Sequence, residues 1–190
     1  MQNRFLSLLL IFFINIILIS PVVAENEFNF TITEIEVLDN GNKIIGKNRG
    51  DISTSDGLTI SANTFEYDKT KNILNANGNV IIEDDLKNYK IFSEDITYNK
   101  NKDVIFSKGS TSAKIKSRYD LKTKNMFFLR GEKILKSNYQ TTVKDIQTKT
   151  LLDLEKVNMN IENEVLKGEN VLVISNYDLP QNDKLFFANS

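Results

Sequence analysis

The sequence contains no cysteine, no histidine and no tryptophan, and only two prolines. Without cysteine the chain forms no disulfide, and without cysteine and histidine it lacks the ligands of the usual zinc sites. The missing histidine excludes Ser–His and Cys–His nucleophile pairs and histidine acid–base catalysis. Lipid attachment to a cysteine is excluded as well. We therefore expect neither a metal nor a cofactor, and we expect a protein that is not an enzyme.

The charge balance also excludes a class of partner. The chain has 24 Lys and Arg against 25 Asp and Glu, a formal net charge of −1. A nucleic-acid partner demands a strongly basic face. We therefore predict no nucleic-acid partner.

The first 24 residues differ from the rest of the chain. Arg4 precedes a nearly unbroken apolar run that Pro21 ends, and small residues up to Ala24 suit a cleavage site. This pattern is typical of a secretory signal peptide over residues 1–24, followed by an exported domain over residues 25–190. An exported chain without cysteine suits the periplasm, the space between two bacterial membranes.

An uncleaved anchor helix is the competing interpretation of this segment. Phe5 to Val23 approaches the length of about 20 apolar residues that a membrane span needs. Asn15 and the break at Pro21 weaken that interpretation and favour cleavage.

Almost every segment after residue 25 has a β signature. Turn signals recur about every ten residues, among them Asn40-Gly41 and Asp56-Gly57, pairs that accept positive φ in hairpins. Many runs between the turns alternate apolar and polar residues, which places one face inside and the other in water. The predicted strands are Lys43–Ile45, Leu58–Ala62, Phe65–Tyr67, Ile73–Ala76, Val80–Glu83, Ile91–Tyr98 and Val104–Ser107.

In one segment the spacing of the apolar residues fits both a helix and a strand. In Lys144–Leu166 the spacing of Leu151, Leu154 and Val157 suits a helix, whereas the alternation from Val157 onward suits a strand. A strand is favoured because the ending of a sequence repeat follows directly.

The chain repeats itself. "ISANTFEYDKTKNILNANG" (60–78) matches "IFSEDITYNKNKDVIFSKG" (91–109) in pattern, 31 residues later, and weaker copies include "YDLKTKNMFFLRG" (119–131). Repeats of this length indicate stacked units, each too small to bury its own apolar face. The last residues, "DKLFFANS" (183–190), resemble the start of another unit. We therefore expect an unpaired strand edge there, open to pairing with another chain.

The repeated residues resemble a known family. "GLTISANTFEYDKTKNILNANGNVIIED" is similar to the OstA-like (organic solvent tolerance-like) domain of lipopolysaccharide-transport proteins, through Ile60, Ala62-Asn63, Tyr67-Asp68 and Gly78-Asn79-Val80. The second copy keeps Tyr98 and Gly109 but has Asn99 in place of the Asp. The resemblance covers residues 43–173. The sequence of residues 43–68 is most similar to the N-terminal periplasmic domain of the assembly protein LptD, and LptA and LptC are other relatives.

The resemblance implies an all-β fold in which stacked antiparallel strands form an open β-jellyroll with an apolar groove. It implies lipopolysaccharide as ligand and other lipopolysaccharide-transport proteins as partners through strand-edge pairing. It places the protein in the periplasm, associated with the outer membrane. A chain of 190 residues does not hold an LptD barrel as well, so we expect either a truncated LptD-like chain or a stand-alone bridge protein.

Alternation supplies the candidate residues that line the groove. They are Leu58, Ile60, Phe65, Tyr67, Leu74, Val80, Ile82, Ile91, Ile96, Tyr98 and Ile105. The same residues also suit a packed core, so a β-repeat scaffold or adhesin without a lipid ligand is the alternative. A polysaccharide-processing β-solenoid enzyme is a further alternative.

The charged residues give weaker signals. Asp84-Asp85 and Glu94-Asp95 are neighbours within strands and point to opposite faces, which does not suit a glycosidase pair. The lysines and arginine of "KIKSR" (114–118) could touch lipid phosphates, but their alternation favours an exposed strand.

Overall fold

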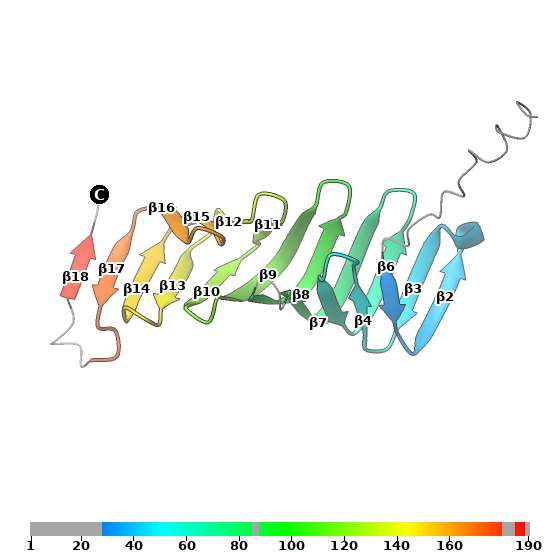
Figure 1. Cartoon of the computed structure of the whole chain (residues 1–190), viewed down its shortest axis with the longest axis horizontal. Helices are drawn as coiled ribbons and strands as arrows, with labels where there is room; N and C mark the ends of the chain where they lie inside the picture. The colour runs from blue at the N-terminus through cyan, green and yellow to red at the C-terminus, as the bar shows by residue number, and fades with distance from the viewer. Residues whose placement is uncertain (1–27, 85–87, 180–184, 189–190) are drawn as a thin grey trace, which may run out of the picture.

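The computed structural model describes residues 28–84 and 88–179 and the backbone of 185–188. The predicted signal peptide lies outside this range. Within these described residues, eighteen strands hydrogen-bond into one continuous sheet, and they form an elongated stack that runs from β2 at one end to β18 at the other (Figure 1). Every pairing is antiparallel, and the sheet folds over into two layers that face each other. The predicted all-β, open antiparallel β-jellyroll is therefore confirmed.

Each layer consists mainly of short strands. Layer one contains β2 (Glu34–Leu38), β3 (Lys43–Lys47), β6 (Thr64–Asp68), β11 (Phe127–Leu129), β12 (Ile134–Ser137), β15 (Lys156–Asn160) and β16 (Val165–Glu169). Layer two contains β1 (Asn29–Thr31), β4 (Gly50–Ser53), β5 (Thr59–Ala62), β10 (Tyr119–Lys124), β13 (Thr141–Asp145), β14 (Thr150–Leu154), β17 (Leu172–Ser175) and β18 (Leu185–Ala188).

Three long central strands belong to both layers. They are β7 (Ile73–Asp84), β8 (Tyr89–Asn99) and β9 (Val104–Ile115). The ladder register shifts where each of them passes from one layer to the other, between Asn77 and Val80 and between Ser93 and Asp95. Gly78 and Gly109 lie at these shifts with φ of 78° and 82°. We call this line of bulges the crease. The described hairpin turns of both layers lie on the opposite side, which we call the mouth.

The crease corrects one prediction. The sequence predicted separate strands at Ile73–Ala76 and Val80–Glu83, whereas the structure has the single strand β7. Gly78 and Asn79 both have positive φ, which bends the strand as a bulge does instead of reversing it as a turn does.

Two other sequence interpretations can be compared with the structure directly. The ambiguous segment is confirmed as strand, because β14 and β15 lie within it and β16 begins near its end. Asn40 and Gly41 have positive φ as expected. They belong to a short 3-10 turn, η1 (Asp39–Gly41), in a loop between Leu38 and Lys43 that is longer than a two-residue hairpin.

Successive units are tied together at their turns by backbone hydrogen bonds. In layer one the amides of Lys69, Lys100, Arg130 and Ile161 donate to the carbonyls of Asn42, Asn72, Asp103 and Lys133, with distances of 2.9 to 3.0 Å. The recurrence of this bond from turn to turn is the structural form of the sequence repeat. Within the described part of the chain, no helix has the length and hydropathy of a membrane span.

The two crease glycines give a matched prediction. A Cβ on Gly78 would lie 2.7 Å from Asn63 Nδ2, whereas a Cβ on Gly109 would meet nothing within 4 Å. Both substitutions to alanine carry the strain of positive φ, about 1–2 kcal/mol. We expect Gly78→Ala to lower the free energy of unfolding more than Gly109→Ala, measured by urea denaturation. Equal losses would show that Asn63 moves aside without cost.

Candidate functional site

The interior between the layers is built from two columns of apolar side chains. In layer one, residues paired directly across successive strands form column one: Val37, Ile44, Tyr67, Leu74, Tyr98, Ile105, Phe128, Leu135, Met159 and Leu166. In layer two they form column two: Phe30, Ile52, Ile60, Ile82, Ile91, Ala113, Leu121, Val143, Leu152 and Val173. Within the described side chains, every member of the two columns is aliphatic or aromatic.

Ring contacts join the two layers across this interior. Tyr89 of layer two meets Phe128 of column one with ring centroids 4.9 Å apart. Phe28, just before β1, packs edge-on against Tyr67 at 4.8 Å and against Tyr98 at 5.9 Å. The two columns therefore face each other across one shared apolar core.

All eleven candidate groove residues face this interior, each at most 5% exposed. Tyr67, Leu74, Tyr98 and Ile105 belong to column one, Ile60, Ile82 and Ile91 belong to column two, and Leu58, Phe65, Val80 and Ile96 are buried beside the columns. The structure thus brings them together between the layers. Their contact with a lipid stays a prediction.

The columns are sealed in the middle and accessible at the ends. Tyr98 and Leu121 are 0% exposed. At one end Val37 is 58% exposed, and at the other end Leu166 and Val173 are half-buried. The interior therefore meets solvent at the two ends of the stack.

Along the crease the interior turns polar. Thr123 Oγ1 lies 2.8 Å from Ser137 Oγ and from Thr141 Oγ1, and Ser107 Oγ lies 2.8 Å from Thr111 Oγ1. A hollow of about 1120 Å³ also lies there, lined largely by polar side chains; Val80 is the one candidate groove residue among its lining residues. The crease hollow is therefore distinct from the apolar interior.

On the mouth side, Arg130 ties layer one to layer two. Its guanidinium is buried, with the side chain 3% exposed, and it contacts Asp56 Oδ2 and Asp103 Oδ1 at 2.7 Å each. Asp56 lies in the turn between β4 and β5 of layer two, whereas Asp103 and Arg130 lie in turns of layer one. The Arg130 Nη1 also donates to the Tyr98 hydroxyl at 2.7 Å. We call this group the Arg130 clamp.

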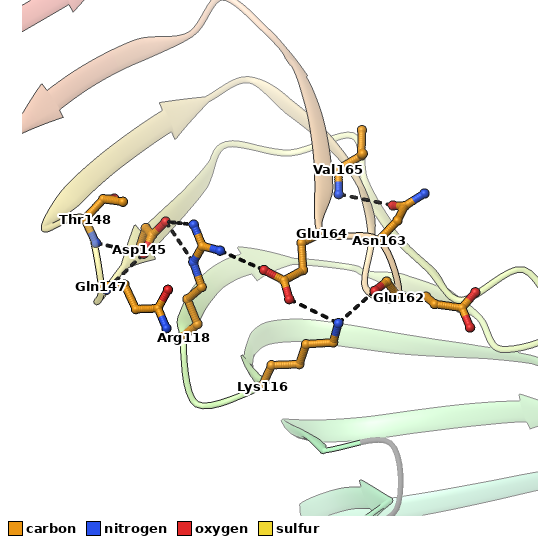
Figure 2. A network of polar contacts seen from close by, with 9 residues as sticks. All are labelled: Lys116, Arg118, Asp145, Gln147, Thr148, Glu162, Asn163, Glu164 and Val165. Atoms are coloured by element: carbon orange, nitrogen blue, oxygen red, sulfur yellow. Dashed lines mark hydrogen bonds and ion pairs between the residues drawn. The ribbon is translucent and has the colours of Figure 1, made fainter.

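A second group bridges the mouth nearer the C-terminus (Figure 2). Arg118 Nη1 donates to Glu164 Oε2 at 2.8 Å, and Lys116 Nζ donates to Glu164 Oε1 at 3.1 Å. Lys116 and Arg118 lie in the layer-two turn between β9 and β10, and Glu164 lies in the layer-one turn between β15 and β16. We call Lys116, Arg118 and Glu164 the Arg118 clamp.

Asp145 holds the Arg118 clamp in place. Its Oδ2 accepts hydrogen bonds from Arg118 Nη2 at 2.7 Å and from Arg118 Nε at 3.1 Å. Its Oδ1 accepts from the backbone amides of Gln147 and Thr148. Asp145 therefore orients the Arg118 guanidinium toward Glu164 (Figure 2).

The position of Lys116 and Arg118 in a turn shows that the interpretation of "KIKSR" as an exposed strand is wrong for residues 116–118. The strand β9 ends at Ile115, and Lys116 and Ser117 both have positive φ, so they form the hairpin turn. Sequence reasoning missed this turn because neither residue is Gly, Asn or Asp, the usual occupants of such positions. The carboxylate partner, Glu164, lies too far along the chain for local patterns to reveal.

The repeat has a polar signature at its turns. Tyr67 donates to Asn72 Oδ1 at 2.9 Å, and Tyr98, 31 residues later, donates to Asp103 Oδ1 at 2.8 Å. Both acceptors have positive φ. These bonds fix the hydroxyl ends of two column-one tyrosines at the mouth.

The clamp charges shift the pKa values of their carboxyl groups. Partial burial by itself raises the pKa of Asp56, but hydrogen bonds from Thr54 and Arg130 outweigh it and lower that pKa to about 2. The hydrogen bond from Arg118 lowers the pKa of Asp145, and the hydrogen bond from Lys116 lowers the pKa of Glu164. All three groups are thereby stabilised as carboxylates.

Comparisons with known proteins identify the fold. No protein-family model matches the sequence, and no curated protein matches it. Among solved structures, the chain is similar to the crystal structure of LptH, described as the LptA homologous periplasmic component of the conserved lipopolysaccharide transport device from Pseudomonas aeruginosa. The match has a TM-score of 0.52 and 13% sequence identity, and it covers 72% of this chain and 99% of that chain. At this identity the likeness establishes a shared fold.

The lowered pKa values predict acid-sensitive stability. Because the pKa of Asp56 is about 2 in the folded protein and about 3.8 unperturbed, its contribution is complete above about pH 4 and is lost as pH falls toward about 2. We expect the melting temperature to fall over this range, and to fall less in Asp56→Asn, which starts lower at pH 7. Glu132→Gln, at an exposed turn position, is the control. Parallel pH curves for wild type and Asp56→Asn would contradict the role of Asp56.

Proposed function

We propose that this protein is a periplasmic carrier that shields the acyl chains of lipopolysaccharide on their way to the outer membrane. The observation that carries the proposal is the pair of unbroken apolar columns that face each other along the whole stack. The shared fold with LptH, described as a lipopolysaccharide-transport component, supports the same role. That neighbour is a transport protein, which also supports a non-enzymatic function.

The physical problem explains why this architecture suits the task. Each methylene exposed to water costs about 0.8 kcal/mol, so several acyl chains together cost on the order of tens of kcal/mol. Apolar contact is non-directional. A hydrocarbon chain therefore slides from one unit to the next along a column without breaking specific bonds.

The partners of this carrier follow from the ends of the stack. Two stacks would join end to end if the edge strand of one molecule paired with the edge strand of the next, as in strand addition to an exposed sheet edge. Among the described strands, β1 and β2 are the edges at one end of the stack, and β16 and β18 are the edges at the other. We propose other lipopolysaccharide-transport proteins as the partners at these edges. The sequence likeness of residues 43–68 to the N-terminal domain of LptD supports a position near the outer membrane.

Export is the premise of a periplasmic role, and it can be tested directly. We expect residues 1–24 to be removed, so that the mature protein begins at Glu25. Intact-mass spectrometry of the protein recovered from the periplasm checks the cleavage position. Recovery of uncleaved chain in the membrane fraction would instead support an anchored form.

A packed scaffold without lipid is the second candidate. Ile52, Ile60, Ile82 and Leu121 are all 0% exposed in the described structure, which is how the core of an ordinary sandwich looks. A carrier must open to admit its ligand, whereas a scaffold has no need to.

Photo-crosslinking separates the two candidates. A diazirine analogue of similar size replaces Ile82, which faces the interior, or its neighbour Ile81, which lies on the opposite face of the same strand. After irradiation in cells we expect lipopolysaccharide to be captured at position 82 and not at position 81. Capture of protein alone at position 82 would favour the scaffold. Equal capture at both positions would indicate non-specific contact with lipid.

A further inference from the structure

The mouth is closed by contacts that cross from one layer to the other. The Arg130 clamp joins residues separated by 74 positions in the chain, and the Arg118 clamp joins residues separated by 46 to 48. Both bridge hairpin turns, the parts of each layer farthest from the crease. Separation of the turns would uncover the columns along their length.

The Arg130 clamp is connected to the apolar interior through one side chain. Tyr98 contributes its ring to column one, and the same residue's hydroxyl donates to Asp103 and accepts from Arg130. The guanidinium also lies over the Tyr98 ring, 5.7 Å from the centroid. A hydrocarbon chain that displaces this ring therefore disturbs the contacts of Arg130.

The Arg118 clamp is built differently. Its members are partly accessible to water, with side chains 28% to 34% exposed. Exposed ion pairs hold weakly and are screened by salt. This end of the mouth is consequently the easier one to open.

We propose that the two clamps form a latch, which holds the mouth closed in the empty protein and releases to let acyl chains enter sideways between the layers. The latch rests on the proposed carrier function and specifies the route by which the ligand reaches the columns. Entry from the two accessible ends of the stack is the competing route.

A reversible covalent lock tests this route. The natural chain has no cysteine, so a thiol reagent reacts only at introduced positions. In the variant Lys116→Cys/Glu164→Cys, a bis-maleimide with a reducible disulfide in its spacer joins the two layers across the mouth. Because the natural side chains meet end to end, a spacer of their combined length spans the gap. The lock is applied to the folded protein as recovered from the periplasm and is cut with dithiothreitol.

A matched control joins two turns of the same layer. Lys133 and Glu162 form an ion pair between neighbouring layer-one turns, and Glu162 lies two residues from Glu164. The variant Lys133→Cys/Glu162→Cys carries the same residue types and the same cross-linker. Cross-linking this variant restrains two layer-one turns at the mouth but does not join layer one to layer two.

The measurement is the association rate of cis-parinaric acid, a fatty acid that fluoresces in apolar surroundings, followed by stopped flow. We expect the locked mouth variant to bind at least about tenfold more slowly than the same sample after reduction, because opening limits entry. The control is expected to change less than about twofold on reduction. Labelled lipopolysaccharide provides a second probe under the same conditions.

The outcomes distinguish the latch from the carrier function. If the locked and reduced forms bind at the same rate, chains enter at the ends and the latch is wrong, while the carrier function stands. If wild type and all variants bind neither probe, the carrier function itself fails. If the control slows as much as the mouth variant, the lock acts through general stiffness and the latch is wrong.

Discussion

Antiparallel pairing in a fixed register is the constraint on which the rest of this structure depends. Directly paired residues share a face of the sheet, so an apolar residue at each paired position produces a column. A slip of one residue in any strand would turn its column member outward and place a polar neighbour inside. The repeat of 31 residues, with its tyrosine and turn residues, prevents that slip by placing the turns at equivalent positions.

The crease shows how demanding this constraint is. In β8, Ile91 and Ile96 both face inward, although they are an odd number of residues apart and alternation alone would place them on opposite faces. The register shift between Ser93 and Asp95 resolves the conflict, because β8 passes the crease with one residue fewer than β7 and β9. The bulges therefore do two things: they fold the sheet and keep both halves of each long strand facing the same interior.

A structural feature can be predicted from the sequence when the residues that determine it lie close together along the chain. Alternation is local, so the inward phase of Ile60 and Ile82 follows from a few neighbouring residues. The inward residues of the weaker copy at 119–131, such as Leu121 and Phe128, carry the same alternation and could have been found by continuing the register. Arg130 and Glu164 have partners far away in the chain. Their roles therefore depend on the folded layers, and no spacing rule reveals them.

A sealed interior and a lipid carrier are compatible when their free energies are compared. Breaking an ion pair with one buried partner, such as Arg130–Asp56, costs at most about 3–5 kcal/mol, and the partly accessible Arg118 clamp, which water and salt screen, adds less than that. Burial of about ten methylenes of one acyl chain returns on the order of 8 kcal/mol. One chain therefore offsets the loss of both clamps.

The proposed carrier function also accounts for the polar character of the clamps. Without ligand, an interior left open would expose the columns to water and invite aggregation along their length. Apolar residues at the mouth would close it as well, but they would then compete with the acyl chain for the same contacts. Ion pairs hold the layers together through an interaction that hydrocarbon does not replace. In the proposed carrier, the strength with which the clamps close the mouth is thereby set independently of the affinity for acyl chains.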